Sequence, residues 1–405
     1  MLNIIQLLKK PKIILIIIIL STAFLRIYRL DYPNKYIFDE VYHAFTAKEF
    51  LKGSKEAWEW WTTPPKDVAY EWTHPPLAKE IMAISMLLFQ TTDGCTWRLP
   101  GSLLGILCVY LVYLLGIKLF KNHIPSLIAA FVFSIDGLNF VQSRIGMNDI
   151  YYLTFILASL IFLLRKNYLV SSIFFGLALS SKWAAVYFSL VIIFILFKDR
   201  QIKRLFLFIL VPPLIYLLSY LPFFLQGHTF DQFIQLQQQM WWYHTNLKAT
   251  HDYTSPWWSW PLNLYPVWYF VDYKENSISN IFASGNPIVF WVGTVAVILT
   301  LLSAIKEKSF NLLLVVLGFL IFWLPWALSP RIMFLYHFAP SVPFLSLALG
   351  YQLSLEYDKR KKAVYLLLIL MAVSFILIFP FLTGIHIPKN FINLFFLSNM
   401  AKNPF

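Results

Sequence analysis

Cysteine is scarce in this chain: Cys95 and Cys108 are the only two among 405 residues. No Cys/His cluster has zinc-site spacing, and Cys108 falls in an apolar run, so we expect no structural disulfide. The 14 glycines form no phosphate-binding loop, and no internal repeat is visible. The absence of an ATP-binding motif implies that the energy for any chemistry comes from the substrate itself.

Charge is also sparse, at 13% of residues, whereas 59% are hydrophobic and 19% aromatic. Apolar runs of roughly 17 to 22 residues recur, the length that a helix needs to cross a bilayer. Helices satisfy their own backbone hydrogen bonds in lipid, so we predict an all-α polytopic membrane protein. About eleven spans are expected, at residues 12–30, 98–117, 124–143, 149–164, 168–181, 183–197, 205–225, 286–305, 310–328, 331–352 and 363–384.

Basic residues decide the expected orientation. With a cytoplasmic N-terminus and an external C-terminus, the inner segments carry 17 basic and four acidic residues, which accounts for the whole formal net charge of +13. Such loops bind anionic lipid headgroups, so we expect membrane lipids and no nucleic acid as partners. Residues 1–12 and the first span read as a retained signal-anchor, and the short apolar segment 77–91 as an interfacial helix.

Two long segments, 31–97 and 226–285, are expected on the outer face, where they would carry the working surface. Aromatic residues are dense in both, including Trp257 and Trp258 in the second. An interfacial aromatic belt explains most of them, and an aromatic wall for a sugar or a peptide is the competing interpretation.

The carboxylate pair Asp39 and Glu40 lies just after the first span. Desolvation at the membrane exit would raise the pKa of Asp39 and make it a usable base. Adjacent residues at a helix start point in different directions, so we expect different tasks for the two. A helix cap is the alternative.

Further polar groups are expected at the same membrane face. His74 precedes two prolines, which fix the backbone before a helix start. Isolated cations could pair with a phosphate at the bilayer surface, although snorkelling explains any one of them. These side chains are Arg98, Arg144 with the nearby Asp149, Lys182 in an interrupted span, and Arg331.

Several motifs in order give the chain a clear resemblance to the protein O-mannosyltransferase family of glycosyltransferase family 39, membrane enzymes of the GT-C fold. They are Asp39-Glu40, His74-Pro-Pro-Leu-Ala-Lys79, Trp97-Arg98-Leu-Pro100, Ser143-Arg144 with Asp149, Ser181-Lys182-Trp183, Met240-Trp-Trp-Tyr-His244, Ala249-Thr-His251, Ser255-Pro-Trp-Trp-Ser-Trp-Pro261, Pro266-Val-Trp268, Gly285-Asn-Pro287 and Phe334-Leu-Tyr-His337. They cover nearly the whole chain, which we treat as one domain, 1–405. The folded insert that eukaryotic members carry between spans seven and eight is missing.

The resemblance implies eleven spans and inverting transfer of mannose from a polyprenyl-phosphate donor to Ser or Thr hydroxyls of proteins crossing the plasma membrane, with the translocon as a candidate partner. It implies that Asp39 and Glu40 are catalytic, Glu40 beside the acceptor, and that Arg98 lies near the lipid phosphate. We expect Arg144, Lys182 and Arg331 to assist with that phosphate. The expected positioning residues are His74, Asp149, His244, Trp257, Trp258 and His337.

Three alternatives stay open at this point. A sister GT-C enzyme could move aminoarabinose or a hexose onto a lipid or glycan. A transporter would keep its ionisable groups near mid-bilayer on repeated spans, a pattern that the sequence lacks. A divalent cation held by Asp39, Asp149 and His74 could assist the phosphate.

Overall fold

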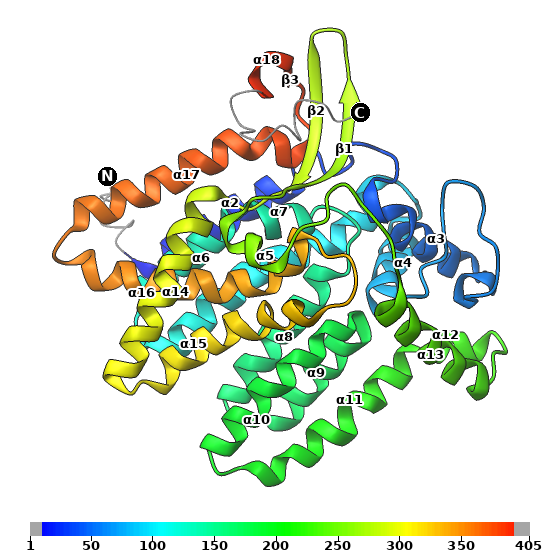
Figure 1. The fold of residues 1–405 in the computed structure, drawn as a ribbon, viewed down its shortest axis with the longest axis horizontal. Coiled ribbons are helices and arrows are strands. Elements are labelled where there is room, and N and C mark those ends of the chain that lie inside the picture. The colour runs from blue at the N-terminus through cyan, green and yellow to red at the C-terminus, as the bar shows by residue number, and fades with distance from the viewer. Residues whose placement is uncertain (1–9, 393–405) are drawn as a thin grey trace.

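The computed structural model describes residues 10–392, which form a body of packed helices with one small sheet (Figure 1). The first nine residues of the expected signal-anchor, and the last residues of the expected external C-terminus, lie outside this range. Local sequence explains many helix boundaries. Asn286 accepts hydrogen bonds from the amides that follow Pro287, and Gly384 ends α17 in a left-handed conformation.

The elements follow one another without a domain break. The helices are α2 (Pro11–Ile27), η1 (Phe38–Val41), α3 (His43–Lys52), η2 (Glu56–Trp58), α4 (Leu77–Phe89), α5 (Gly94–Phe120), α6 (His123–Ser134), α7 (Gly137–Gln142), α8 (Asp149–Leu164), α9 (Tyr168–Ser181), η3 (Trp183–Phe188), α10 (Ser189–Lys198), η4 (Ile202–Arg204), α11 (Leu205–Ser219), α12 (Leu221–Leu225), α13 (Phe230–Asn246), η5 (Trp257–Leu262), α14 (Pro287–Glu307), α15 (Phe310–Ile321), η6 (Leu324–Leu328), η7 (Leu335–Ser341), α16 (Val342–Tyr357), α17 (Lys361–Thr383) and α18 (Lys389–Ile392).

Four helices form the centre of the body. Helix α8 packs against α5 and α9, and α16 packs against α6 and α14. The helices α8 and α16 bury almost every residue over most of their length, whereas α11 and α17 leave rows of large apolar side chains exposed, among them Ile209, Leu210, Leu366 and Ile376. Exposed apolar rows on outer helices are what contact with lipid tails requires.

Within residues 10–392, six helical segments are long and apolar enough to cross a membrane: 94–120, 202–219, 287–307, 310–328, 335–357 and 361–383. Shorter apolar helices occupy 123–134, 149–164, 168–181 and 183–198, and α2 occupies the first expected span. Helices therefore lie in all eleven predicted stretches. The chain is a multi-pass membrane protein, while eleven crossings and the sides of the two termini stay predictions.

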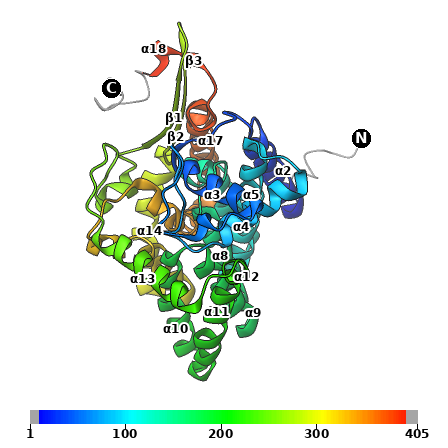
Figure 2. The same cartoon turned by 90° about the vertical axis from the view of Figure 1, so that its right-hand side faces the viewer.

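The two segments that the sequence places outside the membrane meet in the structure. Helices α3 and α4 come from the first, α13 comes from the second, and Figures 1 and 2 both show them close together with α12. A separate apolar cluster joins them, formed by Ala57, Trp58, Tyr220, Phe223, Phe233, Leu236 and Met240. The prediction that a helix begins after the His74-Pro-Pro turn is confirmed, since α4 starts at Leu77.

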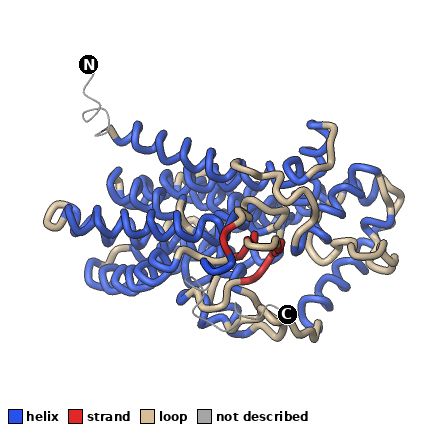
Figure 3. Tube along the Cα trace, turned by 90° about the horizontal axis from the view of Figure 1, so that it is seen from above, coloured by secondary structure: helices blue, strands red, loops and turns tan. Residues whose placement is uncertain are grey.

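The all-α prediction needs one correction. Strand β1 (Val267–Tyr273) pairs antiparallel with β2 (Ser277–Ala283), and the short β3 (Ile387–Pro388) joins the other edge of β2. The hairpin projects beyond the helices in Figure 2, and Figure 3 shows how little of the chain is strand. Aromatic and β-branched residues favour strands, and Trp268 stacks on Phe282 across the pair with ring centroids 5.1 Å apart.

Candidate active site

The short helix η1 carries Asp39 and its neighbours. Phe38 has a positive φ of 47°, which is unusual for a bulky residue, and its ring stacks on Tyr269 of β1 at 4.1 Å between centroids. Gln142 in turn donates a hydrogen bond of 3.1 Å to the Tyr269 hydroxyl. The backbone beside Asp39 is thus held in a conformation that costs about 1 to 3 kcal/mol elsewhere, a feature that clusters at functional sites.

Asp39 is partly exposed, and within residues 10–392 no group donates a hydrogen bond to its carboxylate. Burial raises the pKa of Asp39 to about 7; Lys182 opposes this shift, Glu71 and Asp149 add to it, and Arg331 opposes it. A carboxyl group with a pKa near neutrality and no partner can accept a proton from a substrate.

Glu40, the next residue, has a different environment. Its side chain is fully buried, and its two oxygens accept hydrogen bonds of 2.7 Å each from Nε and Nη2 of Arg98. The indole of Trp97 and the amide of Gly146 donate to the same carboxylate at 3.0 and 2.9 Å, and the Ile37 amide donates at 3.1 Å. Glu40 therefore ties η1 to α5 and to the turn before α8.

Arg98 is also buried, and its remaining donors go to the carbonyls of Leu30, Pro33 and Lys35. All five N–H groups of a guanidinium are thereby committed within the chain. The expected contact of Arg98 with the lipid phosphate does not fit this geometry, because no donor is left for a phosphate. Its structure is that of an anchor for Glu40.

Arg144 is likewise buried and directed elsewhere than expected. Its Nη1 donates to the carbonyls of Leu25 and Arg26 at 3.0 and 2.6 Å, at the C-terminal end of α2. A cation there satisfies the free carbonyls of a helix end and is stabilised by the helix dipole. Arg144 fastens α2 to the core, so it too is poorly placed to bind a phosphate.

Lys182 and Asp149 form an ion pair beside Asp39. The Lys182 ammonium lies 2.9 and 3.0 Å from the two Asp149 carboxylate oxygens, and both side chains are buried. Lys182 stands where α9 stops and η3 begins, so the interruption predicted in this span is confirmed. Its charge acts on Asp39, although Asp149 already neutralises much of it.

Arg331 is the expected cation that stays most available. Its Nη1 bonds to Nδ1 of His244 at 2.6 Å, it is half-buried, and within residues 10–392 its Nε is buried without a partner. The other His244 nitrogen, Nε2, lies 2.8 Å from the Thr73 carbonyl, so it carries the proton and Nδ1 accepts from Arg331. Burial, followed by the charge of Arg331, lowers the pKa of His244 to about 4.

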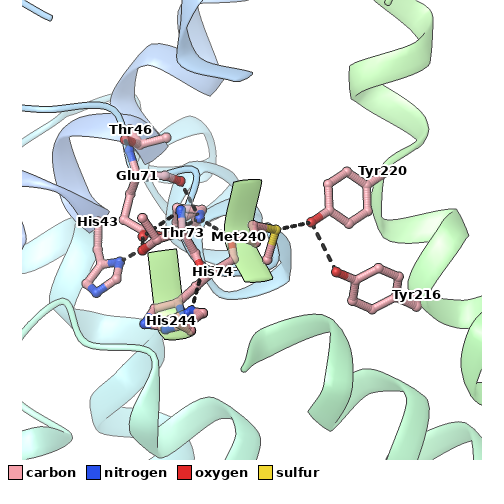
Figure 4. A network of polar contacts seen from close by, with 10 residues as sticks. His43, Thr46, Glu71, Thr73, His74, Tyr216, Tyr220, Met240 and His244 are labelled. Carbon is pink, nitrogen blue, oxygen red and sulfur yellow. Dashed lines mark hydrogen bonds and ion pairs between the residues drawn. The ribbon is translucent and has the colours of Figure 1, made fainter. Parts of the chain in front are cut away.

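His74 lies between two other imidazoles, with ring centroids 5.0 Å from His244 and 6.1 Å from His43 (Figure 4). Burial lowers the pKa of His74 well below its ordinary value, with help from His244, so the ring is neutral. Within the described residues, Nδ1 of His74 is buried and has no hydrogen-bond partner. The stack therefore joins α13 to the turn before α4.

Glu71 and Lys79 support this stack from below the His74 turn. The Lys79 ammonium lies 2.6 Å from the Glu71 carboxylate and donates to the carbonyls of Glu71 and His74 at 2.7 and 2.8 Å. Both side chains are buried. Thr73 and His43 also contact the Glu71 carboxylate, as Figure 4 shows. Burial would raise the pKa of Glu71, but Lys79 and His43 outweigh it and lower the pKa.

The remaining expected residues differ in exposure. The His337 ring is buried, with centroids 4.1 Å from Trp326 and 4.6 Å from Tyr336, and its Nδ1 accepts from the Phe334 amide. Trp257 is half-buried against Trp323, whereas Trp258 is 52% exposed. The aromatic wall next to His337 is made by Trp260 and Trp326, residues that the sequence did not single out.

Sequence reasoning also missed Glu71, His43 and Tyr269. Glu71 could have been found from its position, three residues before His74 and eight before Lys79 in one polar segment. For a metal ion, the described residues contain no group of three or more His, Cys, Asp or Glu side chains placed to hold one. Asp149 is bonded to Lys182 and His74 lies between His43 and His244, so the proposed set of Asp39, Asp149 and His74 does not fit a divalent cation.

An unpaired carboxylate with a raised pKa, beside one available arginine and neutral histidines, suits base catalysis on an anionic substrate at a membrane. Solved structures agree with a membrane glycosyltransferase fold. The yeast protein O-mannosyltransferase Pmt1–Pmt2 complex bound to the sugar donor has a TM-score of 0.78 at 16% identity, covering 93% of this chain and 90% of that one. ArnT from Cupriavidus metallidurans bound to undecaprenyl phosphate has a TM-score of 0.60 at 15% identity, covering 84% and 59%.

The sequence model of dolichyl-phosphate-mannose-protein mannosyltransferase matches residues 16–247, and that of the C-terminal four-helix region of protein-O-mannosyltransferase matches 229–398. This chain belongs to that family and is a glycosyltransferase. Its polyprenol-phosphate-mannose–protein mannosyltransferase relatives include those of Mycolicibacterium smegmatis, at 22% identity over 79% of this chain and 80% of theirs, and Mycobacterium tuberculosis, at 23% over 92% and 88%.

Proposed function

We propose that this enzyme transfers mannose from a polyprenyl-phosphate-linked donor to Ser or Thr hydroxyls of proteins, with inversion, on the non-cytoplasmic face of the plasma membrane. The family match and the named relatives support the sugar, the donor and the protein acceptor. The observation that carries the mechanism is the unpaired Asp39 carboxylate with its pKa near 7.

In the proposed reaction the acceptor oxygen forms a bond to the anomeric carbon while the bond to the phosphate oxygen breaks. Asp39 takes the hydroxyl proton, and the phosphate leaves with the electron pair of the broken bond. Attack from the face opposite the phosphate inverts the anomeric centre. The phosphate needs no proton on leaving, but its charge needs stabilising.

Arg331 is the residue best suited to hold that phosphate, because its Nε has no partner in the described chain and its Nη1 is oriented by His244. Lys182 contributes a second positive charge at longer range, tempered by Asp149. We assign Glu40, Arg98 and Arg144 to shaping the site, and His74, His244 and His337 to its walls. Trp257 and Trp258 are proposed to flank the entry, and the translocon to deliver acceptors.

The test uses purified protein in liposomes, polyprenyl-phosphate-mannose and a Ser/Thr-rich peptide. Wild type should form mannosyl-peptide with inverted configuration, and Asp39→Asn should lower transfer by about 10² to 10⁴-fold. Donor binding by Asp39→Asn, measured separately, serves as the control for folding. Near wild-type turnover in that variant would remove Asp39 from its role.

A transferase of another polyprenyl-phosphate-linked sugar is the second candidate, supported by the likeness in fold to ArnT. That likeness is weaker than the one to the yeast mannosyltransferase, and it covers 59% of the ArnT chain. Product formation from an aminoarabinose donor, with none from the mannose donor, would favour it.

A further inference from the structure

Strand β1 has an outer edge that no other part of the described chain pairs with. The sheet order is β1-β2-β3, so β2 is paired on both sides and β1 on one. Near the hairpin tip, β3 covers the outer side of β2 through the pairs Ser277–Pro388 and Ile278–Ile387. No backbone hydrogen bond in residues 10–392 reaches the outer side of β1.

The register shows which groups this edge presents. The Lys274 amide donates to the Ser277 carbonyl at 2.9 Å, so these two residues form a hydrogen-bonded pair. Hydrogen-bonded and non-hydrogen-bonded pairs alternate along an antiparallel ladder. Tyr273, opposite Ile278, and Val271, opposite Asn280, are therefore the residues whose amides and carbonyls point away from β2.

The edge leads to the active site. Tyr269 lies two residues before Val271 on the same strand, and its ring stacks on Phe38, the neighbour of Asp39. The ladder is irregular between Trp268 and Phe270, and such bulges are common beside active sites. At the other end Tyr273 is 50% exposed, so a chain can approach from solvent.

We propose that the acceptor polypeptide binds in extended form as an added strand on the outer edge of β1, with its hydroxyl-bearing residue directed toward Asp39. This inference rests on the proposed function, which makes a polypeptide the acceptor. Pairing with a free edge uses backbone hydrogen bonds and is largely independent of side chains. It gives an enzyme without a folded recognition insert a way to bind acceptors of different sequence.

The first experiment places single N-methyl groups on successive amides of the acceptor peptide and measures transfer by the wild-type enzyme. Only every second amide of an added strand points at the edge. We expect KM for the peptide to rise about three- to tenfold at alternate positions, the loss of one backbone hydrogen bond, and to change little at the positions between. Equal effects at all positions, or none, would overturn the pairing.

The second experiment changes the edge. Val271→Pro removes an outward N–H and leaves the bonds to β2 in place, whereas Val271→Thr keeps the N–H and is the matched control. We expect a higher peptide KM in Val271→Pro alone, with unchanged donor KM and melting temperature. A change in oligomeric state without a KM change would show instead that the edge pairs two copies of this chain. Transfer without either KM effect contradicts the pairing alone, while absence of all transfer from the wild type contradicts the proposed function.

Discussion

Arg98 donates two hydrogen bonds of 2.7 Å to the two carboxylate oxygens of Glu40, and neither side chain reaches solvent. The carboxylate next to it, on Asp39, is partly exposed and has no donor in the described chain. Two adjacent acids thus differ in kind: one is a fixed structural anion, and the other is available for proton transfer. This difference gives separate predictions for the two residues.

Glu40→Gln should destabilise the fold. Removing one partner of a buried ion pair leaves the other charge uncompensated, which costs about 3 to 5 kcal/mol. Thermal unfolding in detergent should show a clearly lower melting temperature and a lower yield than Asp39→Asn, although the two changes are chemically alike. If Glu40→Gln keeps the wild-type melting temperature and only raises the peptide KM, Glu40 contacts the acceptor directly.

Activity should depend on the ionisation of Asp39. A base works when deprotonated, so kcat/KM for the peptide should rise about tenfold per pH unit below the Asp39 pKa of about 7 and level off above it. A rate profile from pH 5 to 9 measures this. A profile that is flat between pH 5 and 7 would contradict the assignment.

Stability should show the same group with the opposite sense. The folded pKa of Asp39 lies above its ordinary value of 3.8, so between about pH 4 and 7 the folded state holds a proton that the unfolded state has released. Stability from this group is therefore lost as pH rises through that window. Asp39→Asn should melt higher than wild type at pH 8 and show little difference at pH 4.

Arg331→Gln should weaken donor binding. The change removes the cation that we assign to the phosphate, so we expect a donor KM at least about tenfold higher, since hydrogen bonds to charged groups contribute about 1.5 to 3 kcal/mol. Arg331→Lys should recover part of it by restoring the charge without the fork of donors. Arg360, exposed beside Glu356, gives the control Arg360→Gln, which should leave the donor KM unchanged.

Tyr269→Ala should lower turnover by loosening the backbone at Phe38. The stacked ring helps to hold a left-handed Phe38, and without it Asp39 loses its fixed direction. We expect kcat to fall about tenfold or more with donor KM unchanged. Tyr269→Phe keeps the stack and loses only the bond to Gln142, so it should retain most activity. Equal kcat in Tyr269→Ala and wild type would show that the stack does not position Asp39.

Local patterns were enough for much of the fold. Each of the eleven apolar stretches is helical because apolar runs of this length report burial in lipid or core directly. The turn before α4 and the break at Lys182 were equally readable, since proline and a lone buried cation restrict the backbone locally. The hairpin was missed, although β1 is a run of aromatic and β-branched residues, because its aromatic density was interpreted as an interfacial wall.

The sequence by itself determined the class of protein, the helical stretches and the candidate groups of the site, because these depend on residue types and on spacing along the chain. Only the tertiary structure decided which groups are free. Arg98 and Arg144 are saturated by carbonyls and a carboxylate from distant segments, while Arg331 and Asp39 keep unfilled hydrogen-bonding capacity. Hydrogen-bond saturation is a property of neighbours in space, and one-dimensional spacing carries no measure of it.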